Sequence, residues 1–382
     1  MSRSDFLSAR ERMLMRIAQT RDVSTAGLPH WARTEDGKWT FTSDGDWTGG
    51  AFVGQLWLAH LADPLRFPIS DAHSALARML PRAERRTAFK GFGFYHGAAL
   101  GSILFGDETA RDAAFTAARS LQQMFDPTLG LIPLGQDAEE ASAVGIAESS
   151  IDTLQATGLL YWAADQLGDA HMEDVANAHM RRVLEIHVRP DNSVIQSSTL
   201  DPQTGKVLRT HTHKGYSDVS TWGRAQGWAM LYAAHAAMVR PKQPLWRQYA
   251  VRVLDWWIHH VPGDLVAYWD FDDPAIPTTS RDTAATAIAA AASLRLASAL
   301  GPVDGAKYQE FAERTVAQLA SSYLTPIAPG DQRPLGMLTG GCFTHKAARD
   351  IDTAPDAELI FGSYFLFESL VILTGLVPTG RI

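Results

Sequence analysis

The sequence predicts an all-α protein with the architecture of an (α/α)6 barrel, in which six inner helices are surrounded by six outer helices. Three observations predict it. Apolar segments with almost no charge alternate strictly with segments whose apolar residues recur every three or four positions. Strand signals are sparse. The 382 residues contain no Pro-, Ser- or Gly-rich tract long enough to be a linker, so we expect one domain over residues 1–382.

The uncharged segments are the candidates for the inner ring. A helix that is apolar on every side must be buried on every side, and it therefore needs other helices around it. Gly, Ser, Thr, His and Gln interrupt these segments too often for membrane spans. The six segments cover residues 47–62, 91–106, 149–164, 222–239, 282–294 and 362–373.

The charged segments between them are the candidates for the outer ring. Each carries its apolar residues on one side, so one face covers the inner ring and the other meets solvent. The six segments cover residues 6–17, 72–80, 111–124, 172–183, 246–256 and 312–323. One small β-hairpin insertion is expected from residues 192–199 and 207–213, which are joined across the turn sequence Asp201-Pro202-Gln203-Thr204-Gly205.

The composition excludes several classes of protein. The chain has 34 basic and 42 acidic residues, a net charge of −8, and 46% hydrophobic residues, which fits neither a disordered chain nor a basic nucleic-acid-binding surface. The single Cys342 excludes an intramolecular disulfide framework, and charges among the first 20 residues leave no hydrophobic core of a signal peptide. We therefore expect a cytoplasmic protein with no nucleic-acid or membrane partner. Nucleotide-binding and serine-hydrolase motifs are absent from the sequence.

The few polar residues of the inner segments fall near their starts. Asp152, Arg224 and Asp282 each lie within the first four residues of a segment. Because the inner helices of such a barrel run parallel, their starts meet at one end, together with unsatisfied N–H groups and the positive ends of the helix dipoles. The sequence predicts a pocket at this end that suits an anionic ligand.

Plainer interpretations exist for these residues. Asp152 follows two serines and fits a first-turn dipole partner, whereas Arg224 and Asp282 fit a buried ion pair or caps better than catalysts. His211 and His213 have a spacing that metal sites use, but no third ligand motif is near, so we expect no metal.

Other polar and aromatic residues are weighed in the same way. Lys90 is expected to be solvated. The tryptophans are mostly core residues by default, and only one or two are needed as walls for a sugar ring. The tryptophans concerned are Trp47, Trp57, Trp162, Trp222 and Trp228.

Six stretches form a recognisable set. They are Glu148-Ser149-Ser150-Ile151-Asp152, His211-Thr212-His213-Lys214-Gly215-Tyr216, Ser220-Thr221-Trp222-Gly223-Arg224-Ala225-Gln226-Gly227-Trp228, Trp47-Thr48-Gly49-Gly50, Asp282-Thr283-Ala284-Ala285 and Gly362-Ser363-Tyr364-Phe365. Their order and spacing, over roughly residues 47–373, resemble the unsaturated glucuronyl hydrolases, glycoside hydrolase family 88.

The resemblance implies the same barrel and a glycoside hydrolase. Such an enzyme removes a 4,5-unsaturated uronic acid from the non-reducing end of lyase-generated oligosaccharides by hydrating the C4=C5 vinyl ether. One carboxyl acts first as acid and then as base, and Asp152 matches it by motif. The resemblance implies no cofactor. The substrate-binding residues that it implies are Trp47, Gly91, Gln196, His213, Lys214, Trp222, Arg224 and Gln226.

The chain departs from the family pattern at four positions. Gly91 stands where the family has a second Asp, and Lys214 stands where it has Gln beside the substrate. Gln196 corresponds to a family His, and Ser363 to an Asp. Losing a carboxylate and gaining an ammonium favours a more anionic ligand, with Lys214 contacting a carboxylate or sulfate or orienting water. The glycine at position 91 is also expected to open room for a different sugar.

Three alternatives remain open at this point. Conventional inverting hydrolysis requires a second carboxylate, which Asp137, Glu139, Glu140 or Asp282 would supply. A non-catalytic sugar-binding barrel is favoured by the changes at Gly91 and Gln196. A sugar epimerase on the same fold needs paired histidine bases that the sequence does not place on inner helices.

Overall fold

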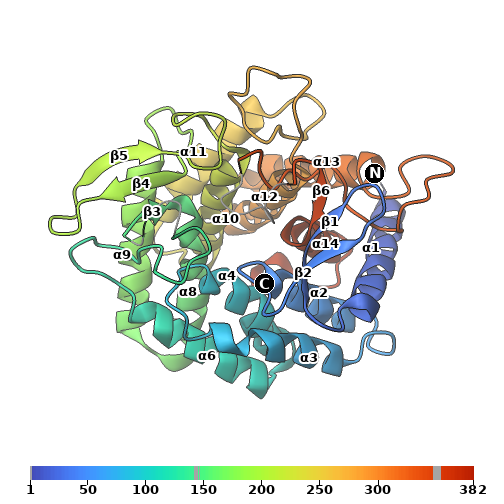
Figure 1. Cartoon of the computed structure of the whole chain (residues 1–382), viewed down its shortest axis with the longest axis horizontal. Coiled ribbons are helices and arrows are strands. Elements are labelled where there is room, and N and C mark those ends of the chain that lie inside the picture. The colour runs from blue at the N-terminus through green and yellow to red at the C-terminus, as the bar shows by residue number, and fades with distance from the viewer. Residues whose placement is uncertain (1, 142–144, 146, 347–353) are drawn as a thin grey trace.

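The computed structural model describes residues 2–141, 145, 147–346 and 354–382. Its described helices form an inner and an outer ring (Figure 1), which confirms the predicted (α/α)6 barrel. The inner ring consists of α2 (Gly49–Ala62), α4 (Lys90–Phe94) continuing through η2 (Tyr95–Ala99) into α5 (Leu100–Phe105), α8 (Gln155–Leu167), α10 (Gly223–Val239), α12 (Thr283–Asp304) and α14 (Ile360–Leu373). The outer ring consists of α1 (Arg3–Val23), α3 (Ile69–Met79), α6 (Glu108–Gln122), α9 (Ala170–His187), α11 (Pro244–His260) and α13 (Ala306–Ser322).

Burial follows the predicted division between the two rings. Every residue of α2 from Gly49 to Ala59 is buried. In the outer helix α3 only Ala72, Ala75, Leu76 and Met79 are buried, and their spacing places them on one face. The inner helices are therefore held by packing on all sides, and their starts are fixed in position around the barrel axis.

The helix ends carry the expected signals. Asp107 accepts a hydrogen bond of 2.8 Å from the backbone N–H of Ala110 at the start of α6, and Asp169 accepts one of 3.0 Å from the N–H of Met172 at the start of α9. The inner helices before them end at Gly106 and Gly168, whose positive φ values of 66° and 64° suit glycine. Each glycine–aspartate pair therefore turns the chain from the inner ring to the outer ring.

The predicted hairpin is present, with shorter strands than expected. Strands β4 (Ser197–Leu200) and β5 (Val207–His211) pair antiparallel, and β3 (Ser149–Ser150) adds to β4. Asp201 holds the turn by accepting hydrogen bonds from the backbone N–H groups of Gln203 and Thr204, at 2.8 and 2.9 Å. This sheet joins the segment that precedes α8 to the segment that precedes α10.

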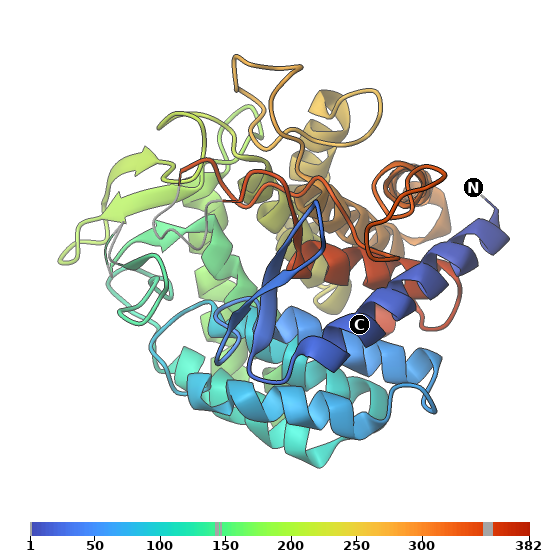
Figure 2. The same ribbon diagram turned by 45° about the vertical axis from the view of Figure 1, so that its right-hand side comes forward.

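A second small sheet was not predicted from the sequence. Strands β1 (Leu28–Arg33) and β2 (Trp39–Thr42) form a hairpin, and β6 (Ala357–Leu359) pairs with β1. Figure 2 shows this hairpin lying in front of the helical rings. The pairing of Trp31 with Leu359 joins distant parts of the chain, so no local sequence pattern predicts it. Two small sheets leave the all-α class unchanged.

Among the described residues, α12 alone is long and apolar enough to cross a membrane by length and composition. Its most apolar window is 78% buried inside the barrel, as expected for an inner helix. Such a helix is weak evidence for a membrane span.

Candidate active site

The starts of several inner helices meet at one small cavity. Trp47 lies just before α2, Phe89 caps α4, Trp222 caps α10, and Asp152 belongs to the 3-10 turn η3 (Ile151–Leu154) that leads into α8. This confirms that the helix starts gather at one end. The cavity volume of about 10 Å³ leaves space for about one water molecule. The lining residues are Trp47, Phe89, Glu140, Asp152, Gln155, Lys214, Trp222, Arg224 and Trp228.

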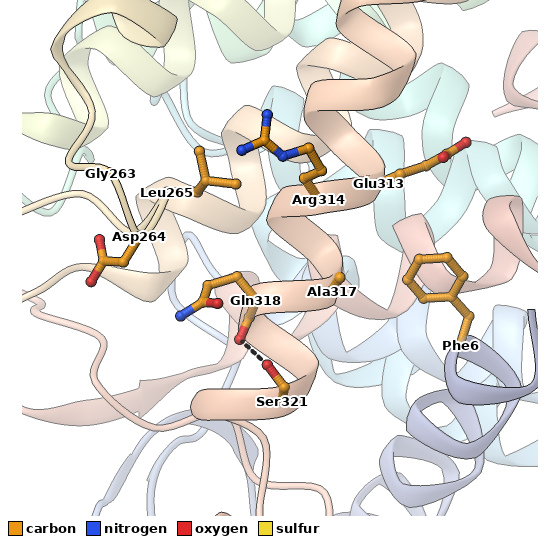
Figure 3. A pocket seen from close by; sticks show the side chains of 9 residues that line it. All are labelled: Phe6, Gly263, Asp264, Leu265, Glu313, Arg314, Ala317, Gln318 and Ser321. Atoms are coloured by element: carbon orange, nitrogen blue, oxygen red, sulfur yellow. Dashed lines mark hydrogen bonds between the residues drawn. The ribbon is translucent and has the colours of Figure 1, made fainter. Parts of the chain in front are cut away.

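Larger hollows lie on the outside of the barrel. A groove of about 390 Å³ runs between α13, the loop after α11 and Phe6 of α1 (Figure 3). Its carboxylates Asp264 and Glu313 point away from each other, and Asp264 forms an ion pair of 2.9 Å with Arg281. No inner helix contributes to the lining of this groove, so it lacks the convergent buried polar groups of the smaller cavity.

Asp152 is the carboxyl at the centre of the small cavity, and its side chain is held in place by two neighbours. Ser150 donates a hydrogen bond from Oγ to Oδ2 of Asp152 at 2.5 Å, and Gln196 donates from Nε2 to the same oxygen at 3.3 Å. Oδ1 has no hydrogen-bond partner among the residues that the structure describes. Asp152 is 6% exposed, so its carboxyl is buried but reaches the cavity.

The surroundings of Asp152 favour its protonated form. Burial raises the pKa of Asp152 above its ordinary value, and the negative charge of Glu140 raises it further. The hydrogen bond from Ser150 and the positive charges of Lys214 and His213 lower this pKa, but burial and Glu140 outweigh them. A carboxyl in such a place is suited to donate a proton.

Gln196 is fixed by three further contacts. Its Oε1 accepts hydrogen bonds from Oγ1 of Thr212 at 2.7 Å and from the backbone N–H of Lys214 at 3.1 Å. Its backbone oxygen accepts from the N–H of Ile151 at 2.9 Å. The amide nitrogen of Gln196 is thereby directed toward Asp152. The sheet of β3, β4 and β5 therefore positions the carboxyl.

A second carboxylate, Glu140, lines the same cavity. Its Oε2 accepts a hydrogen bond from Nε2 of His213 at 2.9 Å, and its Oε1 forms an ion pair with the ammonium of Lys214. Burial would raise the pKa of Glu140, but the charges of Lys214 and His213 hold it well below its ordinary value. Glu140 is therefore a carboxylate, whereas Asp152 beside it is biased toward the acid.

Arg224 is locked into the wall of the cavity by an ion pair. Its Nη1 lies 2.5 Å from Oδ2 of Asp282, which also caps α12 by accepting from the N–H groups of Ala284 and Ala285. The guanidinium also donates to the backbone oxygens of residues 342 and 343 and stacks on Trp222 at 4.5 Å. The interpretation of Arg224 and Asp282 as paired and capping residues is confirmed.

Two polar atoms in the cavity wall are buried without a partner among the described residues. They are Oε1 of Gln155, an acceptor, and Nε1 of Trp222, a donor. Buried polar groups normally form hydrogen bonds, so this acceptor and this donor are available to a water molecule or to a ligand with hydroxyl groups. The ring of Trp47, which packs against Phe361 at 5.0 Å, supplies an aromatic wall.

The chain is similar to enzymes that act on unsaturated uronic acids. An unsaturated glucuronyl hydrolase from Bacillus sp. (strain GL1) is 30% identical over 343 residues, covering 85% of each protein. An unsaturated chondroitin disaccharide hydrolase from Streptococcus pneumoniae is 27% identical over 333 residues, covering 85% of this chain and 81% of the relative. The crystal structure of the Bacillus sp. GL1 enzyme superimposes with a TM-score of 0.86 and 28% identity, over 96% of both chains. No family model matches the chain.

The chain belongs to the unsaturated glucuronyl hydrolases. It is a glycoside hydrolase of that type. The (α/α)6 barrel predicted from the alternation of helices is the fold of this family.

Most of the residues that the family resemblance singled out come together. Trp47, Asp152, Lys214, Trp222 and Arg224 line the cavity. Gln196 contacts Asp152 directly. His213 lies behind Gln196 and contacts both Gln196 and Glu140.

Gln226 is not brought to the cavity. Its amide donates to the backbone oxygens of Asn192 and Val253, at 3.2 and 2.9 Å, and so faces the outer layer. With 3.6 residues per turn, two residues that are two positions apart point to nearly opposite sides of a helix, and Arg224 takes the side that faces the cavity. Trp228, four positions after Arg224, shares that side and lines the cavity.

Gly91 does not open room in the cavity, and that expectation was wrong. A Cβ placed on Gly91 would lie 2.4 Å from Cα of Ala156 and 2.5 Å from the backbone oxygen of Gln155. The glycine allows α4 and α8 to touch. The position at which the resemblance implies a second Asp is therefore closed in this chain.

The expectation for Lys90 was also wrong. Lys90 is not solvated but 3% exposed, and its ammonium donates to the backbone oxygen of Arg85 at 2.6 Å and to Ser120. Ser363, which stands where the resemblance implies an Asp, does not line the cavity and donates to Glu358 at 2.9 Å. Glu140 forms an ion pair with Lys214, and the contact of Lys214 with a carboxylate or sulfate of the sugar stays a prediction.

The two histidines of the metal hypothesis each pair with one carboxylate. His211 pairs with Glu148, and His213 pairs with Glu140. Within the described ranges, no group of three or more His, Cys, Asp or Glu side chains gathers in a way that would hold a metal ion.

Four lining residues were not assigned to the site from the sequence, although Trp228 was weighed as a wall for a sugar ring. Phe89 and Trp228 follow from helix geometry, and Gln155 follows from Asp152, because three positions on a helix share a face. Glu140 was considered only as one of four partners for inverting hydrolysis. It lies in a loop without periodicity, so only the three-dimensional structure places it beside Lys214.

Proposed function

We propose that this enzyme removes a 4,5-unsaturated uronic acid from the non-reducing end of lyase-generated oligosaccharides, with Asp152 as the general acid and then the general base. The observation that carries the proposal is the buried carboxyl of Asp152, which the helix starts and the β3–β4–β5 sheet hold at the cavity. The relatives support the substrate class, since they are named for unsaturated glucuronyl and chondroitin disaccharide substrates. A related structure at 28% identity and a TM-score of 0.85 is a variant with dGlcA-Glc-Rha-Glc.

The proposed reaction begins with the protonated carboxyl. Asp152 transfers its proton to C4 of the vinyl ether, and positive charge develops at C5 and the ring oxygen. A water molecule adds at C5 and gives a proton back to the Asp152 carboxylate, so the acid is regenerated. The resulting hemiketal opens, and the glycosidic bond breaks with release of the remaining saccharide. The net reaction consumes one water per bond.

The residues around Asp152 are assigned matching roles. Ser150 and Gln196 hold Oδ2 and stabilise the carboxylate that forms after proton transfer. Gln155 and Trp222 offer an acceptor and a donor to sugar hydroxyls. The ligand-free cavity holds about one water molecule, so sugar binding requires the lining side chains to move apart.

The assay for this function follows the C4=C5 bond itself. Unsaturated uronyl disaccharides are incubated with the enzyme, and the loss of their ultraviolet absorbance is recorded. Wild type should remove the absorbance, and Asp152→Asn should not. Full activity of Asp152→Asn would overturn the assignment of the acid.

A second function is favoured by one observation, the presence of Glu140 in the same cavity. Conventional inverting hydrolysis needs an acid and a base on opposite sides of the sugar, roughly 6.5–9.5 Å apart. Asp152 would be the acid and Glu140 the base. Release of sugar from saturated glucuronides, with no loss of absorbance from unsaturated ones, would select this function.

We also infer a cytoplasmic location. Cys342 is buried and unpaired, which is compatible with a reducing compartment. Fractionation of the source cells with an antibody against the enzyme tests it, and recovery in the medium would contradict it.

A further inference from the structure

The cavity contains a carboxylate that no inner helix supplies. Glu140 comes from the loop between α6 and β3 and is 5% exposed. Its neighbour Glu139 turns the other way and forms an ion pair with Arg82. The loop therefore directs one acidic side chain into the cavity and the next one away from it.

Lys214 has a buried ammonium that pairs with this carboxylate. The ammonium is 5.8 Å from the ring centre of Trp222 and 5.4 Å from that of Phe343, and Lys214 is 5% exposed. A buried ammonium without a counter-charge is strongly unfavourable, so Lys214 requires Glu140. The two residues form a unit that a change to either one would break.

A chain of contacts joins Glu140 to Asp152. Glu140 accepts from Nε2 of His213 at 2.9 Å, this nitrogen is 3.5 Å from Nε2 of Gln196, and the same amide nitrogen donates to Asp152 at 3.3 Å. His213 is held on its other side by Ser197, whose Oγ is 3.1 Å from Nδ1. The contact between the His213 ring and this amide joins two donors and is not a hydrogen bond, so Glu140 acts on Gln196 by fixing the position of the His213 ring.

The resemblance implies a second Asp at position 91, but this position cannot hold a side chain in this chain. No side chain fits at Gly91, where a Cβ would meet the backbone of α8. Among the residues that line the cavity, Glu140 is the one carboxylate besides Asp152.

We propose that Glu140 is a positioning residue of the hydration reaction, a loop-borne carboxylate that takes the place left by Gly91 and holds Lys214 and His213 around Gln196 and Asp152. This inference rests on the proposed function. The lysine at position 214, where the resemblance implies Gln, and the carboxylate of Glu140 then form one charge pair.

The pair also affects the protonation of Asp152. The charged or titratable groups around this carboxyl are Glu140 from the loop, His213 and Lys214 from the segment after β5, and Arg224 and Tyr232 from α10. The negative charge of Glu140 raises the pKa of Asp152, and Lys214 and His213 lower it. Neutralising Glu140 removes this repulsion, so the pKa of Asp152 should fall.

The experiment compares Glu140→Gln with the matched control Glu139→Gln. Activity on an unsaturated uronyl disaccharide is measured as kcat and KM from pH 4.5 to 9. We expect Glu140→Gln to lose kcat at pH 7, by at most about tenfold for each unit by which the pKa of Asp152 falls, and to recover activity at acidic pH. A merely destabilised enzyme would lose activity across the whole range. Glu139→Gln should keep the wild-type profile, because Glu139 faces Arg82.

The double variant Glu140→Gln/Lys214→Gln tests whether the two charges act as a unit. Removing both should return the profile toward wild type, so the double variant should be more active at pH 7 than Glu140→Gln alone. Glu140→Asp should retain part of the activity. An unchanged profile in Glu140→Gln, or a double variant as displaced as the single one, would overturn the proposal.

A substrate-free measurement separates this inference from the proposed function. Carbon-13 NMR of the Asp152 carboxyl gives its pKa in wild type and in both single variants. A lower value in Glu140→Gln but not in Glu139→Gln supports the role of Glu140 even if no disaccharide is turned over. Loss of the vinyl absorbance in wild type, with equal Asp152 pKa values in all three proteins, supports the function and contradicts the inference.

Discussion

The α-carbon of Ala156 occupies the space into which any side chain at Gly91 would extend. A Cβ on Gly91 would come within 2.4 Å of this atom, because the backbones of α4 and α8 are in contact at the end of the barrel where the inner helices start. The glycine is therefore a packing requirement. The second carboxylate that lines this cavity, Glu140, comes from a loop.

Gly91→Ala should destabilise the protein. The added methyl group must push α4 away from α8, and overpacking of this kind costs about 1–3 kcal/mol in the free energy of unfolding. Urea denaturation monitored by circular dichroism measures the change. Gly263→Ala is the control, because a Cβ there meets nothing within 4 Å. Equal stability of Gly91→Ala and wild type would contradict the close approach of the two helices.

Asp152→Asn should stabilise the protein at neutral pH while abolishing activity. Because the folded state raises the pKa of Asp152, folding favours its protonated form, and this contribution is lost as the pH rises from the ordinary value of 3.8 through the folded value. Asn carries no charge to bury, so the variant should have the higher Tm at pH 7, with the difference vanishing near pH 4.

Thermal denaturation over this pH range tests whether Asp152→Asn has a higher Tm than wild type. A matched aspartate serves as control. Asp201 is a turn residue whose pKa is lowered by hydrogen bonds from the backbone N–H groups of Gln203 and Thr204. Asp201→Asn should therefore give no gain at neutral pH. A lower Tm for Asp152→Asn than for wild type at pH 7 would show that the carboxyl is bound mainly as a structural anion.

Trp222→Phe should weaken substrate binding. The variant keeps an aromatic ring and removes the indole N–H, which is buried without a partner in the ligand-free cavity. Losing one hydrogen bond to a sugar hydroxyl should raise KM by about three- to tenfold, with a smaller effect on kcat. Trp246→Phe removes an equally unpaired indole N–H from the outer helix α11 and should leave KM unchanged. Equal effects of the two substitutions would mean that Trp222 acts through packing.

Asp282→Ala should be far more damaging than the loss of an ordinary cap. It leaves the guanidinium of Arg224 buried without its counter-ion, which costs about 3–5 kcal/mol, and it uncaps α12. Asp169→Ala uncaps the outer helix α9 alone and should cost about 1 kcal/mol. Urea titrations of both variants give the comparison. Similar losses in the two would show that the ion pair contributes little.

The helical rings were predictable because burial imposes a pattern on the sequence. Residues 49–59 carry no charge and are all buried, while α3 shows its four buried residues at helical spacing. The pairing of Trp31 with Leu359 was not predictable, since it depends on the closed barrel bringing the two ends of the chain together.

The candidate site divides in the same way. Asp152, Trp222 and Arg224 lie at helix starts, and a parallel inner ring brings helix starts together, so their meeting follows from the fold. Gln226 was assigned by motif, although helical periodicity already places it on the far side from Arg224. The pairing of Glu140 with Lys214 joins two loops and has no local signature. The burial of Lys90 likewise depends on a contact with Ser120 from another helix.

The most direct test is the loss of ultraviolet absorbance from an unsaturated uronyl disaccharide, measured with wild type and Asp152→Asn side by side. Wild type should remove the absorbance of the C4=C5 bond at the same rate as it releases the second sugar. Asp152→Asn should bind the disaccharide without this bleaching of the absorbance. Equal rates of bleaching in the two proteins, or release of the second sugar with the double bond intact, would contradict proton transfer from Asp152.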